Sequence, residues 1–102
     1  MITKVSEITI EDVADYLRIN ELSESEKKFI STILNISKKY ISSYTGININ
    51  KLDDYSDFIV VVYALCEDMY DNRTLYIDSK EQNKVIDNIL SMHSGNLLWK
   101  EK

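Results

Sequence analysis

The chain contains no proline and only two glycines among its 102 residues, and this shortage of turn residues limits its fold more than any other feature. Sandwiches built from β-strands need many tight turns, and those turns are rich in glycine and proline. Helices joined by short polar loops have no such need. We therefore expect an all-α protein, and the length fits a single domain over residues 1–102.

Periodic apolar residues and helix-start signals predict two helices in the first half of the chain, over residues 9–18 and 24–45. The longer helix begins at a capping box of Ser23 and Glu26, in which each side chain satisfies the other residue's backbone amide. A similar pair precedes the shorter helix. Gly46 follows the longer helix, where a residue in the left-handed conformation commonly ends a helix.

The second half of the chain contains the most apolar run, residues 58–66, inside a third predicted helix over 54–72. The run is rich in β-branched residues and resembles a buried strand, but the helical spacing continues beyond it, which favours a helix. A helix apolar on nearly every side needs cover on nearly every side. A fourth helix is predicted over 79–92. The expected fold is a compact bundle of about four helices, followed by an extended apolar tail containing Leu97, Leu98 and Trp99.

Residues with catalytic or metal-binding chemistry are few and isolated. His93 is the only histidine, and we expect it to lie at a helix C-terminus, where a cation is favoured. Cys66 lies in the apolar run and is expected to be a small buried residue. The carboxylates of Asp53, Asp54 and Asp57 do not have the spacing of a calcium loop, and capping of the third helix explains them more simply. We expect no enzymatic activity, no cofactor and no metal ion.

Charge is distributed unevenly over a chain whose formal net charge is -5. Residues 1–22 and 46–73 carry net negative charge, whereas residues 23–45 carry net positive charge. Acidic and basic surfaces on one small domain suit a head-to-tail contact between copies. The basic charge of the second helix lies in two pairs eleven residues apart, and therefore on one side. There it forms either a solvated face or a ridge that faces phosphates or acidic groups. These residues are Lys27, Lys28, Lys38 and Lys39.

Three short segments stand at the ends of the first three predicted helices: Y-L-R-I at residues 16–19, Y-T-G at 44–46 and Y-D-N-R at 70–73. In this order they resemble the small head–tail connector proteins, also called head-completion or adaptor proteins, of tailed phages and prophages. The resemblance covers nearly the whole chain, about residues 8–99, and includes the Leu-Leu pair of the tail.

The resemblance implies a compact helical domain that assembles as a ring beneath the portal of the phage head, where DNA passes and the tail joins. It implies a structural virion protein without enzymatic activity or cofactor, made in the bacterial host cytoplasm and located at the head–tail junction. The implied partners are further copies of the chain, the portal protein and a further connector or tail-completion protein. DNA is implied only as passing cargo, and a membrane is not.

The expected subunit interface lies on one side of the third helix, where Tyr63 and Tyr70 are seven residues apart and Glu67 lies between them. Tyrosines are enriched at subunit contacts because one end is apolar and the other forms hydrogen bonds. We expect the lysine ridge to meet the acidic residues before the third helix, or to face the channel, and the apolar tail to reach the portal or the next connector. One alternative is a small helical regulatory or adaptor protein of a mobile element that binds one protein partner. A weaker one is a helix-turn-helix DNA-binding protein, which the acidic balance disfavours.

Overall fold

Residues 2–75, 77, 86 and 88–93 are those that the computed structural model describes, and every regular element among them is helical. The all-α expectation is therefore confirmed for this part of the chain. The elements in order are the 3-10 helix η1 (Val5–Glu7), α1 (Ile10–Tyr16), α2 (Glu24–Thr45), the 3-10 helix η2 (Ile49–Asp54) and α3 (Phe58–Asn72).

Helix α2 is the axis of the fold and lies over the predicted range of 24–45. Ser23 Oγ accepts a hydrogen bond from the backbone N–H of Glu26 at 3.2 Å, and Gly46 ends the helix with φ of 76°. Only half of the expected capping box forms, because the Glu26 carboxylate instead accepts hydrogen bonds from Tyr70 and Arg73 at the end of α3. The buried side of α2 is a mostly apolar stripe at helical spacing, which includes Ile30, Ile33 and Ile41 and also the polar residues Ser37 and Thr45.

Helix α1 is shorter than predicted, because Leu17 and Arg18 already form its C-terminal stop. Its start is confirmed: Thr9 Oγ1 accepts from the backbone N–H of Asp12, and the Asp12 carboxylate accepts from the backbone N–H of Thr9 at 2.9 Å. The buried residues of α1 are Val13 and Ala14, which join the same core as α2.

Helix α3 confirms the helical interpretation of the apolar run and ends at the predicted residue, Asn72. Its predicted start was wrong by four residues. The segment before it forms η2, which was not predicted, and its residue Leu52 is fully buried in the core. The short η1 was not predicted either.

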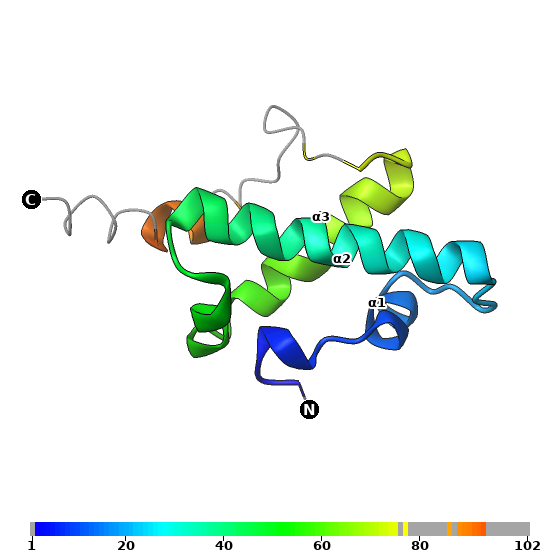
Figure 1. The fold of residues 1–102 in the computed structure, drawn as a ribbon, viewed down its shortest axis with the longest axis horizontal. Helices are drawn as coiled ribbons and strands as arrows, with labels where there is room; N and C mark the ends of the chain where they lie inside the picture. Colours follow the sequence, from blue (N-terminus) through cyan, green and yellow to red (C-terminus); the bar gives the residue numbers. More distant parts are fainter. Residues whose placement is uncertain (1, 76, 78–85, 87, 94–102) are drawn as a thin grey trace, which may run out of the picture.

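Figure 1 shows how these elements surround one core: α3 crosses behind α2, and α1 packs beside both. Residues 88–93 are helical and lie next to the C-terminal end of α2, where Tyr44 Oη is 3.5 Å from Ser91 Oγ. Ile86 and Leu90 are buried in the core. The described part of the predicted fourth helix is therefore helical, while 79–85 and 87 lie outside the described residues. So does the predicted tail of Leu97, Leu98 and Trp99.

Candidate functional site

The three short segments Y-L-R-I, Y-T-G and Y-D-N-R end α1, α2 and α3. The first and the third use an arginine in the left-handed conformation, Arg18 with φ of 61° and Arg73 with φ of 52°. After each arginine, the next backbone N–H donates back into the last turn, from Ile19 to Ala14 O and from Thr74 to Met69 O, both at 3.0 Å. This is the Schellman arrangement, which normally uses glycine at the left-handed position.

The tyrosines of the first and third segments, Tyr16 and Tyr70, each make a contact between helices. Tyr16 at the end of α1 stacks on Tyr63 of α3, with ring centroids 4.8 Å apart and planes inclined by 24°. Burial raises the pKa of the Tyr63 hydroxyl, and the nearby carboxylates of Asp12 and Asp15 add to the effect. The expected interface residue Tyr63 therefore lies among acidic groups of α1, with its ring partly covered inside the chain.

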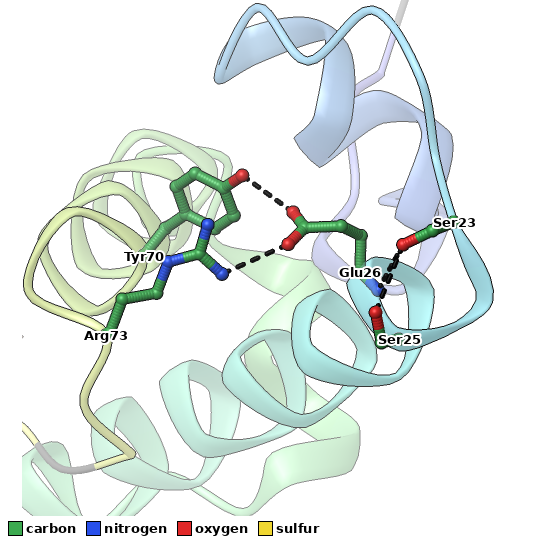
Figure 2. A network of polar contacts seen from close by, with 5 residues as sticks. All are labelled: Ser23, Ser25, Glu26, Tyr70 and Arg73. Atoms are coloured by element: carbon green, nitrogen blue, oxygen red, sulfur yellow. Dashed lines mark hydrogen bonds and ion pairs between the residues drawn. The ribbon is translucent and has the colours of Figure 1, made fainter.

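Tyr70, the second expected interface residue, belongs to a polar network that joins the C-terminal end of α3 to the N-terminal end of α2 (Figure 2). Its hydroxyl donates to Glu26 Oε2 at 2.6 Å, and Arg73 Nη1 donates to Glu26 Oε1 at 3.1 Å. The guanidinium also lies over the Tyr70 ring, 4.3 Å from its centroid, and 5.4 Å from the Phe29 centroid.

Electrostatics in this network favour the charged carboxylate. The hydrogen bond from Tyr70, followed by that from Arg73, lowers the pKa of Glu26 below its ordinary value. The same bond raises the pKa of Tyr70, because its hydroxyl proton is held by a carboxylate. Tyr70 therefore makes a contact within the chain. The sequence analysis did not predict this network, although Y-D-N-R contains two of its three residues, Tyr70 and Arg73.

The acidic residues before α3 have partners that differ from those expected. Asp53 accepts from the backbone N–H of Ser6 at 2.8 Å and from its hydroxyl at 2.6 Å, which joins η2 to η1 and lowers the pKa of Asp53. Asp57 stands at the N-cap of α3 but makes no capping hydrogen bond there. The capping interpretation was therefore wrong for these two residues, and Asp54 is exposed.

His93, which we expected at a helix C-terminus, makes a tertiary contact with the start of α3. Its Nε2 lies 2.9 Å from Asp57 Oδ2, and its ring packs 4.8 Å from the Tyr55 centroid and 4.6 Å from that of Phe58. Its other ring nitrogen, Nδ1, is buried without a hydrogen-bond partner among the described residues. The contact between His93 and Asp57 joins residues 88–93 to the start of α3, and Nδ1 does not reach the surface.

Cys66 behaves as the sequence predicts. It is fully buried, and burial raises the pKa of its thiol to about 11, so it stays protonated at neutral pH. Its sulfur lies 3.5 Å from Ser37 Oγ. Within the part of the chain that the structure describes, no cluster of side chains has the composition of a metal site, and no helix is long and apolar enough to cross a membrane.

The lysines of the ridge lie on two neighbouring sides of α2. Lys27 lies 3.8 Å from Glu24, and Lys38 is near enough to Asp53 to help lower the pKa of that carboxyl. Lys28 and Lys39 are exposed on the side of α2 away from the core. The hydrogen bonds of Asp53, an expected partner of the ridge, come from Ser6 within the chain.

Helix α3 has an uncovered outer side as well. Val60 is 56% exposed, and helical spacing places Tyr63 and Glu67 on the same side. Tyr16, which is 45% exposed, extends this side onto α1. The third expected interface residue, Glu67, therefore lies on an exposed surface that mixes apolar, aromatic and acidic groups.

Comparison with family models, with curated proteins and with solved structures finds no match for this chain. Its function is therefore inferred from its own residues and from the surface that they form.

Proposed function

We propose that this chain is a structural protein without enzymatic activity, a head–tail connector of a phage or prophage. In this proposal it forms a ring beneath the portal, through which DNA passes and to which the tail joins. The observation that carries it is the uncovered outer side of α3, a strongly apolar helix within the described residues. An apolar helix is normally covered, and exposed aromatic and apolar groups on one surface are typical of a protein contact.

The resembling segments support the proposal through their position in the fold. They determine where α1, α2 and α3 end, so the helix lengths depend on the same residues that carry the resemblance. The tyrosines at 16 and 70 also join these helices to one another. The residues on which the resemblance rests therefore also have structural roles in this fold.

The proposed partners are further copies of the chain, the portal protein and a further connector or tail-completion protein. DNA is proposed only as cargo, and the net charge of -5 suits a channel that does not hold phosphates. The tail residues Leu97, Leu98 and Trp99 are proposed to dock on the portal or on the next connector. The site of action is the head–tail junction of the virion.

Deletion of the gene from the genome that carries it tests the proposal. After induction of particles, we expect electron microscopy to show DNA-filled heads and separate tails, with joining restored by the wild-type gene on a plasmid. Normally joined particles, or a genome that yields none, would contradict the connector function. Binding of one partner by a monomer in the same cells would favour the regulatory adaptor instead.

A further inference from the structure

Two surfaces of opposite charge lie on opposite sides of the α2–α3 pair. Helix α3 crosses behind α2 in Figure 1, so the side of α2 that faces the viewer and the far side of α3 point in opposite directions. Both sides are exposed, because the buried residues of each helix face the other helix and the core. A contact between the two surfaces would therefore join two different copies of the chain.

The first surface, which we call the α3 outer surface, combines exposed apolar and aromatic groups with carboxylates. The ring of Tyr63 is held in this surface by stacking on Tyr16, and it lies close to the carboxylate of Asp15. Glu67 and Asp71 follow along α3 at intervals of four residues and are exposed. Its members are Asp15, Tyr16, Val60, Tyr63, Glu67 and Asp71.

The second surface, the α2 outer surface, is basic and polar. Lys28 and Lys39 are eleven residues apart, and Thr32 and Asn35 lie between them on the same side. All four are exposed, and this side lies opposite the buried stripe that contains Ile30 and Ile41.

We propose that copies of this chain associate head to tail, with the α3 outer surface of one copy against the α2 outer surface of the next. Lysine side chains are suited to this contact, because their aliphatic stems cover apolar surface and their ammonium groups bind carboxylates and tyrosine ring faces. The assignment rests on the proposed connector function and deepens it by naming the surfaces between neighbours. It replaces the contact expected at Asp53 and Asp57, whose carboxylates have partners within the chain.

The position of the two surfaces determines the type of assembly. A surface that is complementary to itself gives a two-fold dimer, whereas two complementary surfaces on one molecule give a ring or an open chain of copies. The α3 outer surface is acidic and would repel a second copy of itself. Charge thus favours the head-to-tail arrangement over the two-fold dimer.

Reversal of charge on one surface at a time tests the contact. One variant carries Asp15→Lys and Glu67→Lys, and the other carries Lys28→Glu and Lys39→Glu. We expect sedimentation of the wild-type protein to show association that rises with concentration and weakens with salt, and each variant to be monomeric. An equimolar mixture should associate again, because each altered surface then meets a complementary one on the other variant.

Charge reversals at exposed positions away from both surfaces, Lys51→Glu and Asp54→Lys, serve as matched controls and should associate like the wild type. Circular dichroism checks that each variant is folded, and the neutral pairs D15N with E67Q and K28Q with K39Q replace any reversed pair that unfolds. A wild-type protein that stays monomeric up to millimolar concentration would overturn the proposal. So would normal association of either variant, or a mixture that stays monomeric.

The outcomes separate this proposal from the proposed function. If the contact forms as expected but particles join tails without the protein, the connector function is wrong and the contact stands. If tail joining requires the protein but the charge variants associate and join tails normally, the assignment of these surfaces is wrong and the connector function stands.

Discussion

Replacement of Ile33 by alanine is expected to destabilise the protein strongly, because this residue is central to the packing of α2. Its side chain is fully buried in the core between the helices. Removal of a buried isoleucine side chain to alanine costs about 2–5 kcal/mol, which includes the cavity that remains. A domain of this size has a total stability of about 5–15 kcal/mol, so one substitution removes a large share of it.

Urea denaturation followed by far-ultraviolet circular dichroism measures this loss. The midpoint of unfolding should fall while the slope stays unchanged, and the melting temperature should fall by at least about 8 °C. Ile33→Val provides a milder variant, with an expected cost of about 0.5–1.5 kcal/mol, if the alanine variant does not fold.

Two neighbours on the same helix make the test specific to the buried side. Ile36 is half-buried, so Ile36→Ala should cost clearly less than Ile33→Ala. Asn35 is exposed, and Asn35→Ala should change stability by no more than about 0.5 kcal/mol. Equal losses at all three positions, or a larger loss at Ile36 than at Ile33, would refute the placement of α2 in the core.

Three further outcomes are expected from the polar contacts. Glu26→Gln should lower stability at neutral pH, because the lowered pKa of Glu26 stabilises the fold only while the carboxylate is charged. The stability difference between variant and wild type should therefore shrink as the pH falls below about 4.3, the ordinary pKa of glutamate. Thermal melts measure this difference, and a difference that does not change with pH would contradict the prediction. Asp53→Asn should cost about 1 kcal/mol through its bonds to Ser6, whereas Asp54→Asn should cost little, as denaturant melts would show. His93→Ala should speed amide hydrogen exchange in residues 89–93 without affecting α2, and Met92→Ala, at an exposed side chain, should not.

Local signals made most of the described fold predictable. The range of α2 followed from Ser23 and Gly46, because a cap and a left-handed stop act through neighbouring backbone groups. The helical form of the apolar run followed from its spacing. By contrast, η2 depends on burial of Leu52 in a core that distant segments build, and no local pattern reports such a contact.

The partners of charged side chains were the least predictable feature. Asp53 and Ser6 are 47 residues apart in sequence, as are Glu26 and Arg73. Sequence reasoning assigned these carboxylates to the nearest helix start, which is the commonest local role for them. In the fold, Asp53 accepts hydrogen bonds from Ser6, and Glu26 accepts them from Tyr70 and Arg73, so neither carboxylate caps the nearest helix start.

Because Tyr70 binds Glu26 and Arg73 within the chain, its substitution does not test association between copies alone. A variant that lacks both Tyr63 and Tyr70 would lose the Glu26 network together with any surface contact, so weaker association could result from a loosened α3 alone. Tyr70→Phe removes the hydroxyl and keeps the ring beneath Arg73, and it should affect stability more than association. Val60→Ser changes a side chain that is 56% exposed, and it should affect association more than stability. Measurement of both quantities for both variants therefore separates the contact within the chain from the contact between copies, and loss of association in Tyr70→Phe at unchanged stability would place the interface on the Glu26 side of α3.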